Sequence, residues 1–139
     1  MASLILHHCD LAPFSEKARL AFGAKGLAWH AVEILIWPPK PDLMPLTAGY
    51  RRAPVLQIGA DIHCDTLFIL SEIDRRHPEP SLYPVNQTSL VSVLSCWADT
   101  TMFIQAATLT TSITGVGIPE EFIQDHQVHE PRFQQSRLN

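Results

Sequence analysis

Hydrophobic residues near the start of the chain recur at the spacings of a short strand and an amphipathic helix. Leu4–His8 is a short apolar run, which predicts a buried strand. Pro13 suits the first turn of a helix, because the amide hydrogen that proline lacks would have no partner there. Apolar residues continue at helical spacing to Lys25, and Gly26 is expected to end this helix in the left-handed conformation.

Two segments of different character follow this helix. Trp29–Ile36 predicts a second strand, with Val32, Ile34 and Ile36 on one face. Trp37–Pro45 contains four prolines and is therefore predicted to be an extended connection rather than a helix or a strand.

A hairpin and a second helix complete this part of the pattern. Val55–Ile58 and Ile62–Cys64 flank a Gly59-Ala60-Asp61 turn, as the strands of a hairpin do. Asp65 can cap a helix that runs to about His77. The residues of this helix that are expected to face inward are Leu67, Leu70 and Ile73.

The order of these elements, β-α-β-β-β-α, predicts an α/β fold. The β-α-β part implies a parallel pair of strands, and the hairpin adds antiparallel strands at one edge. The result is a small mixed sheet with helices packed on it. At ~80 residues it can fold alone, although only marginally.

From Ser89 onward the pattern becomes that of one long amphipathic helix, over about residues 88–111. Its apolar residues follow the i, i+3, i+4, i+7 spacing. A single helix cannot bury such a stripe on itself, so the stripe must lie against the first domain, a partner chain or further helices. The stripe consists of Leu90, Val93, Leu94, Trp97, Thr101 and Ile104.

Prolines mark a boundary between these two parts. His77–Pro80 and Tyr83-Pro84 should not continue a helix, and they are interpreted as a linker. Residues 1–84 are expected to form one domain, and residues 85–139 a partial all-helical one with a poorly patterned tail. Within that tail, Glu120–Gln127 can form a short helix, and Val128–Asn139 is expected to be frayed.

Composition narrows the range of functions. The chain has 139 residues, of which 46% are apolar and 17% charged, so it can bury a core. Its formal net charge of −4 argues against a general nucleic-acid binder, which needs a basic face. No apolar stretch is expected to approach the ~20 residues of a membrane span. Neither nucleic acid nor a membrane is therefore expected as a partner.

The cysteines and the first residues bear on the cellular compartment. Cys9, Cys64 and Cys96 are odd in number and widely spaced, which favours a reducing cytoplasm over a disulfide scaffold. Met1–Leu6 lacks a basic region and a small-residue cleavage site, so no secretory signal is expected.

Four stretches, in their order and spacing, carry a resemblance to a known family: Ala12–Leu20, Lys25–Leu27, Arg52–Leu56 and Asp65-Thr66. Through them residues 4–84 resemble the N-terminal, thioredoxin-like domain of glutathione S-transferases of bacterial type. The long helix resembles the start of the family's all-helical second domain. That domain normally has several more helices, so here it is expected to be truncated.

The resemblance implies a glutathione site at three places. A cis peptide bond at Ala53-Pro54 would present the backbone of Ala53 to the cysteinyl unit of glutathione; the alternative is an ordinary loop proline. Thr66, at a helix N-terminus, can hold the γ-glutamyl carboxylate, and Asp65 its ammonium group; the alternative is a simple helix cap. Arg52 or Lys40 can meet the glycyl carboxylate; the alternative is a solvated surface charge.

The residue at the usual catalytic position departs from the family pattern. Catalytic relatives carry serine or cysteine where this chain has Ala12, or a tyrosine near the end of the first strand. A hydroxyl group there would donate to the glutathione thiolate. The remaining candidates are Ser15, which can instead be a structural first-turn residue, and Cys9, which can instead be a small buried hydrophobic residue.

The resemblance therefore predicts a cytoplasmic glutathione S-transferase-like protein, in which glutathione is the co-substrate and its thiol is conjugated to a small electrophile; Ala12 leads us to expect weak activity. Two alternatives stay open: a non-catalytic module that binds glutathione or a partner, and an inactive truncated family member. A homodimer through the helix stripe is possible. No metal is expected, because neighbouring residues in His7–Asp10 and in His63–Asp65 point to opposite faces of a strand.

Overall fold

The computed structural model describes residues 3–84, 86–114, 120–121 and 124. The chain divides into two compact units, Met1–Leu82 and Tyr83–Asn139.

The first unit is an α/β fold around one four-stranded sheet with strand order β2-β1-β3-β4. Its elements are β1 (Leu4–His8), α1 (Pro13–Ala24), β2 (His30–Glu33), α2 (Leu43–Leu46), β3 (Val55–Ile58), β4 (Asp61–Cys64) and α3 (Thr66–Arg76). Apart from the short α2, which was not predicted, the β-α-β-β-β-α order is confirmed. β1 pairs with β2 in parallel, whereas β1–β3 and β3–β4 are antiparallel, as the sequence pattern predicts.

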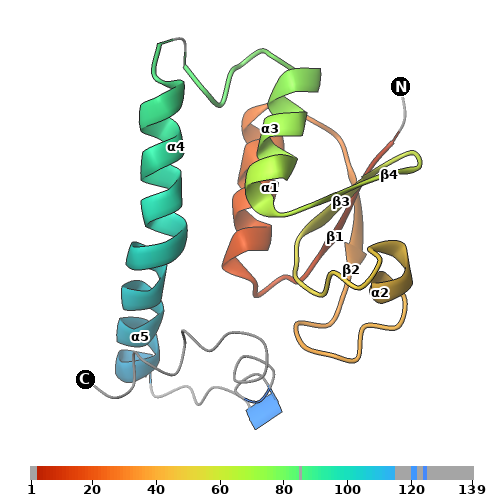
Figure 1. Ribbon diagram of the computed structural model, residues 1–139, viewed down its shortest axis with the longest axis vertical. Coiled ribbons are helices and arrows are strands. Elements are labelled where there is room, and N and C mark those ends of the chain that lie inside the picture. The colour runs from red at the N-terminus through yellow and green to blue at the C-terminus, as the bar shows by residue number, and fades with distance from the viewer. Residues whose placement is uncertain (1–2, 85, 115–119, 122–123, 125–139) are drawn as a thin grey trace. The chain divides into compact units, whose positions relative to one another are not determined.

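The core lies between the sheet and the two longer helices. In Figure 1, α1 and α3 lie side by side against the sheet, and α2 lies beyond the strands on the other side. Leu6 of β1 pairs with Leu56 of β3, and both are fully buried. Phe22, Ile69 and Ile73 cover them from the helices. Each such side chain contributes roughly 1.5–3 kcal/mol through burial.

The end of α1 follows its predicted chemistry. Gly26 has a φ of 63°, a left-handed conformation that costs glycine little. The amide of Leu27 then bonds to the carbonyl oxygen of Phe22 at 3.0 Å, which closes the helix end and turns the chain toward β2.

The strand predicted for Trp29–Ile36 is too long, because β2 covers only His30–Glu33. The partner strand explains the difference, because β1 ends at His8. The carbonyl oxygen of His8 accepts the amide of Ile34 at 2.8 Å, and the pairing of the two strands ends there. β2 is an edge strand of the sheet, and its residue Val32 is 38% exposed.

The prediction of a purely extended connection over Trp37–Pro45 is wrong at its end, where α2 forms a single helical turn. Pro45 is tolerated because it lies in the first turn, where the amide groups have no partner inside the helix. Leu43 is 1% exposed, so its burial anchors this turn.

One of the three residues of α3 that were predicted to face inward does not do so. Leu67 was expected inside but is 42% exposed, whereas Ile69 is buried. The helix begins at Thr66, and the i, i+3, i+4, i+7 series from that residue gives the buried positions. Leu70 and Ile73 are buried as predicted.

A buried ion pair joins the two longer helices to the segment that follows α3. The ammonium of Lys25 lies 2.6 Å from Asp74 Oδ1, and the Lys25 side chain is fully buried. The same ammonium donates to the carbonyl oxygens of His77 and Pro80, at 2.6 and 2.7 Å. Asp74 also accepts the amide of Leu82 at 2.7 Å.

The second unit contains a helix that runs without interruption over Thr88–Thr114. It comprises α4 (Thr88–Trp97), the π-helical turn η1 (Ala98–Met102) and α5 (Phe103–Thr114), so it extends past the predicted end near residue 111. Four members of the predicted apolar stripe are more than half exposed: Leu90, Val93, Leu94 and Trp97.

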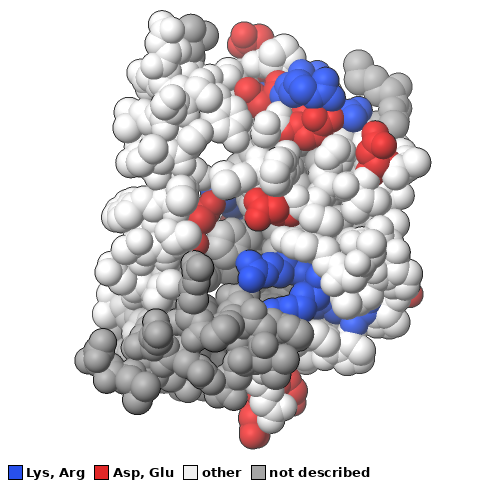
Figure 2. Space-filling model, viewed as in Figure 1, with Lys and Arg blue, Asp and Glu red and all other residues white. Residues whose placement is uncertain are grey.

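This helix is nearly free of charge, and Figure 2 shows its surface as almost entirely white. By length and composition alone it would suffice to cross a membrane, a test that the core helices of many non-membrane proteins also pass. The expectation that no apolar stretch would approach the length of a membrane span is therefore wrong for Thr88–Thr114. The difference arises because Asp99 is the one charged residue in Thr88–Thr114, and the serine and threonine residues between the apolar ones are only weakly polar.

Two expectations fall on the tail of the chain. Val128–Asn139 lies outside the described residues, and so does most of Glu120–Gln127, so neither prediction is tested.

Candidate functional site

Three segments of the first unit lie together at one end of the strands, which we call the site edge of the sheet. β1 ends at His8, β3 begins at Val55 and β4 ends at Cys64. Val55 is the register partner of both His7 and Cys64. The loop that follows β1, the residues before β3 and the first residues of α3 are therefore neighbours, although they lie far apart in the sequence.

The segment before β3 carries the predicted cis peptide bond. Ala53-Pro54 is cis, which confirms the expectation and sets aside the ordinary loop proline. Pro54 is fully buried, and Ala53 is partly exposed. The backbone of Ala53 thus lies at the surface of this edge.

The start of α3 is capped by the residue that the sequence predicts. Asp65 Oδ1 accepts the amide of Leu67 at 2.9 Å, and this carboxylate is exposed. The φ of Asp65 is 73°, a left-handed value that costs a non-glycine residue about 1–3 kcal/mol. The cap and the favourable interaction of a carboxylate with a helix N-terminus help to hold it there. Thr66, the first helical residue, is 7% exposed.

Tyr50 is a further member of this edge that the sequence does not single out. Its hydroxyl lies close enough to Asp65 for the backbone and the charge of that residue to influence the pKa of Tyr50. Burial raises the pKa of Tyr50 above its ordinary value, and the charge of Asp65 raises it further, against the opposing charge of Arg52. Its place beside Asp65 cannot be inferred from local sequence, because only the tertiary fold brings residue 50 to residue 65.

Replacing Asp65 with asparagine should lower the pKa of Tyr50 toward its ordinary value. The negative charge that opposes phenolate formation is removed, whereas asparagine still caps the helix. An alkaline titration followed by near-ultraviolet absorbance measures the change, and the Tyr50→Phe variant identifies the signal. An unchanged titration would contradict the position of the hydroxyl beside Asp65.

The two predicted cationic residues occupy different environments. Lys40 is 6% exposed, and its ammonium donates to the carbonyl oxygen of Arg51 at 2.7 Å, so it braces the segment that leads to β3. Arg52 is exposed and lies close enough to influence Tyr50 electrostatically. Of the two, Arg52 is the side chain that a ligand at the surface can reach.

The residues considered for catalysis lie where β1 passes into α1. Ala12 precedes the helix in an extended conformation, with no side-chain cap. Ser15 is fully buried, and its hydroxyl accepts the amide of Cys9 at 3.3 Å. Cys9 is itself 8% exposed. These positions match the structural alternatives given for Ser15 and Cys9.

His7 and His8, which begin the His7–Asp10 segment, do not converge on one point. His8 is buried on the core side of β1, whereas His7 Nε2 lies 3.1 Å from Gln57 Oε1. Among the described residues, no group of three or more His, Cys, Asp and Glu side chains is arranged to hold a metal ion.

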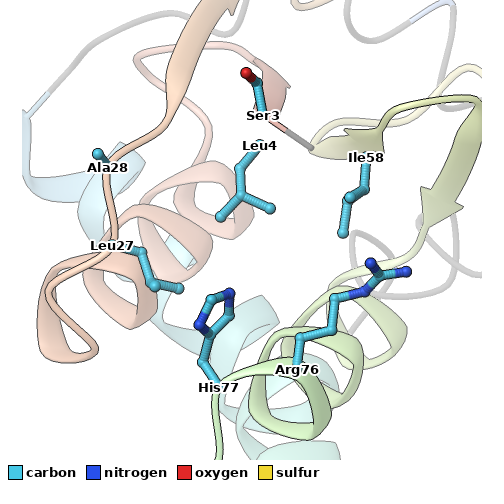
Figure 3. Close-up of a pocket in the computed structure, with 7 residues that line it drawn as sticks. All are labelled: Ser3, Leu4, Leu27, Ala28, Ile58, Arg76 and His77. Atoms are coloured by element: carbon cyan, nitrogen blue, oxygen red, sulfur yellow. The ribbon is translucent and has the colours of Figure 1, made fainter. Parts of the chain in front are cut away.

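A separate cavity of about 330 Å³ opens at the opposite end of the sheet (Figure 3). Leu4 at the start of β1 and Ile58 at the end of β3 form its apolar floor, and Arg76 and His77 border it. Arg76 already pairs there with Glu72 and Asp61. This cavity is remote from the edge that carries the predicted site.

Comparison with protein families identifies the fold. The model of the glutathione S-transferase N-terminal domain matches residues 6–81. The chain belongs to the glutathione S-transferase family. This finding confirms the resemblance drawn from the sequence, and the thioredoxin-like fold of the first unit with it.

Solved structures of glutathione S-transferases resemble the chain in sequence and fold. A GST-like protein from Pseudomonas syringae is 47% identical to this chain, with a TM-score of 0.73. The match covers 78% of this chain and 40% of the Pseudomonas protein. A rice GST in complex with glutathione is 27% identical, with a TM-score of 0.60, over 70% of this chain and 46% of its own.

A glutathione S-transferase from Methylobacterium radiotolerans in complex with glutathione sulfonate is 25% identical, with a TM-score of 0.56. The match covers 60% of this chain and 40% of the Methylobacterium protein. The chain thus spans less than half the length of each of these glutathione S-transferases. No curated protein matches it.

Proposed function

We propose that the first unit binds glutathione at the edge where β1 ends and β3 and α3 begin. The observation that carries this proposal is the register of Val55 with Cys64, which brings Ala53 beside the start of α3. A tripeptide that pairs with the backbone of Ala53 would then place its γ-glutamyl end at Asp65 and Thr66.

Each end of glutathione has a chemical partner in this arrangement. The backbone of Ala53 pairs with the cysteinyl unit in the manner of an added strand. The N-terminus of α3 and the Thr66 hydroxyl accommodate the γ-glutamyl carboxylate, because helix N-termini favour anions. Asp65 uses Oδ1 for its cap and offers its other carboxylate oxygen to the ammonium group.

The glycyl carboxylate is assigned to Arg52, which is exposed, while the buried Lys40 supports the backbone beside it. Relatives support the choice of ligand, since the rice and Methylobacterium proteins were crystallised with glutathione or glutathione sulfonate.

We further propose that the family reaction, conjugation of the glutathione thiol to a small electrophile, proceeds slowly here. The thiolate attacks an electrophilic carbon, a C–S bond forms, and the leaving group departs with the bonding electron pair. Ala12 supplies no hydroxyl group to stabilise the thiolate, and Ser15 is occupied in the interior. The positive end of the α1 dipole remains to lower the pKa of the thiol.

Binding without turnover is the second candidate, and the absence of a hydroxyl or thiol group at Ala12 favours it. We also propose that the protein resides in the cytoplasm, which the three free cysteines support. We propose in addition that it forms a homodimer through the stripe of the long helix, which the exposure of Leu90, Val93 and Trp97 supports.

Replacing Thr66 with valine should weaken glutathione binding roughly tenfold to a hundredfold. Valine keeps the shape of threonine but removes a hydrogen bond to a charged group, which is worth roughly 1.5–3 kcal/mol. Titration calorimetry with the purified chain measures the affinity.

The same substitution at Thr108 is the matched control, because that hydroxyl bonds within α5 at 2.8 Å and lies in the other unit. Equal affinities of the wild type and the Thr66→Val variant would remove Thr66 from the site. No heat from the wild type at millimolar glutathione would overturn the proposed function itself.

A further inference from the structure

Arg19 connects three pieces of structure beside the proposed site. It lies in the second turn of α1, and its side chain is 20% exposed. Its Nη1 lies 2.8 Å from His8 Nδ1, its Nη2 donates to the carbonyl oxygen of Asp10 at 2.9 Å, and its Nε donates to Glu16 Oε2 at 2.7 Å. One guanidinium thus joins the end of β1, the loop after it and α1.

The contact with His8 determines the state of the imidazole. A guanidinium can only donate hydrogen bonds, so Nδ1 of His8 must accept, and the ring is neutral with its proton on Nε2. Asp10 Oδ1 lies farther from the same nitrogen, at 3.4 Å. The ring is 5% exposed and stands edge-on to Trp29, with centroids 5.6 Å apart, so its orientation is held by packing.

The loop Cys9–Ala12 is tied to its surroundings by few bonds. The amide of Cys9 donates to Ser15, and the amide of Ala12 donates to the carbonyl oxygen of Cys9 at 3.1 Å. Between these anchors, Leu11 is 86% exposed. Arg19 thus attaches the middle of the loop to α1, through the Asp10 carbonyl oxygen at 2.9 Å and, more weakly, through Asp10 Oδ1 at 3.4 Å.

We propose that Arg19 is a positioning residue that holds the Cys9–Ala12 loop by bridging neutral His8, the Asp10 carbonyl oxygen and Glu16. The loop carries Ala12, which precedes α1 at the place assigned to the glutathione thiol. The consequence for glutathione rests on the proposed function, whereas the consequence for the loop does not.

Three acceptors in different directions require the planar fork of arginine. Lysine retains the positive charge but presents a single ammonium group, which cannot reach all three. The Arg19→Lys variant therefore distinguishes a positioning role from a mere charge pair with Glu16. Arg75→Lys is the matched control, because Arg75 makes a similar i, i+3 pair with Glu72 on the exposed side of α3.

Cysteine labelling of the intact chain tests the proposal. An alkylating reagent is applied under native conditions, and mass spectrometry gives the rates at Cys9, which is buried, and at Cys64, which is half-buried. We expect Arg19→Lys to raise the Cys9 rate relative to Cys64 roughly tenfold, as the loss of a charge-assisted hydrogen bond predicts. Arg75→Lys should leave the ratio unchanged.

A Cys9 to Cys64 rate ratio in Arg19→Lys equal to that of the wild type would overturn the proposal. This includes the case in which both rates rise equally, which reports general unfolding. Nitrogen NMR supplies a spectroscopic check, since Nδ1 of His8 should be unprotonated in the wild type and should shift toward a tautomer mixture in Arg19→Lys.

Calorimetry with glutathione completes the test. Weaker binding by Arg19→Lys than by the wild type and Arg75→Lys supports a role in the site. If the wild type itself binds no glutathione, the proposed function fails, and the labelling ratio still decides whether Arg19 positions the loop.

Discussion

Replacing Lys25 with methionine should destabilise the first unit by about 3–5 kcal/mol. The lysine side chain is fully buried, and methionine can fill its space but cannot neutralise Asp74, whose carboxylate is 17% exposed and would retain the hydrogen bonds from Leu82 and Ser81 without a cation beside it. The carbonyl oxygens of His77 and Pro80 would lose a donor at the same time. Small domains are stable by only about 5–15 kcal/mol, so the effect is large.

Denaturant unfolding followed by circular dichroism measures this change. Arg75→Met is the control, because its ion pair with Glu72 is on the surface, and it should change stability far less. Adding Asp74→Asn to the Lys25→Met variant should restore part of the loss, since the unpaired charge is then gone. A Lys25→Met variant as stable as the wild type would show that the pair contributes little.

The pH dependence of stability provides a second measurement of the same pair. Burial raises the pKa of Asp74, but the Leu82 amide and the Lys25 ammonium together outweigh it and leave the pKa below its ordinary value of 3.8. The stabilisation is therefore present above that value and is lost as the pH falls through the lowered pKa. Lys25→Met should weaken this loss at acid pH.

Replacing Ala12 with serine should raise the rate of glutathione conjugation roughly tenfold to a hundredfold, provided that the proposed function holds. A serine hydroxyl at this position can donate to the thiolate, and a hydrogen bond to a charged group is worth roughly 1.5–3 kcal/mol. The backbone accepts the change, because Ala12 is the N-cap of α1 with φ −82° and ψ 120°, a conformation that suits a serine cap.

A conjugation assay with a generic electrophile measures kcat/KM for both proteins. The gain should be larger below the pKa of a free thiol, ~8.5, than above it, because the hydroxyl stabilises the thiolate. Ala24→Ser, at the exposed far end of the same helix, is the matched control and should not change the rate. Equal rates for Ala12→Ser and wild type would mean that the missing hydroxyl is not what limits catalysis.

Several elements were predictable because their local chemistry agrees with the fold. Pro13 and Gly26 bound α1, and the hairpin of β3 and β4 forms around Gly59, as their conformational preferences require. The predictions failed where a partner decides the outcome. The length of β2 depends on where β1 ends, and the burial of Leu67 depends on how α3 is turned against the sheet.

The candidate site divides in the same way. The Asp65 cap and the cis bond before Pro54 were expected from the sequence and its family resemblance, and both are confirmed. Tyr50 beside Asp65 was not expected, nor was the burial of Lys40. These positions follow from the path of the chain around α2, which no local pattern encodes.

By itself, the sequence determined the order of strands and helices, the glutathione S-transferase family and the lack of a hydroxyl group at Ala12, because these depend on residue type and spacing. Only the tertiary structure decided that Ser15 is turned inward, that Arg19 clamps neutral His8, and that Lys25 reaches Asp74. The physical reason is that burial and hydrogen bonding between distant segments depend on which surfaces meet, and spacing along the chain does not specify that.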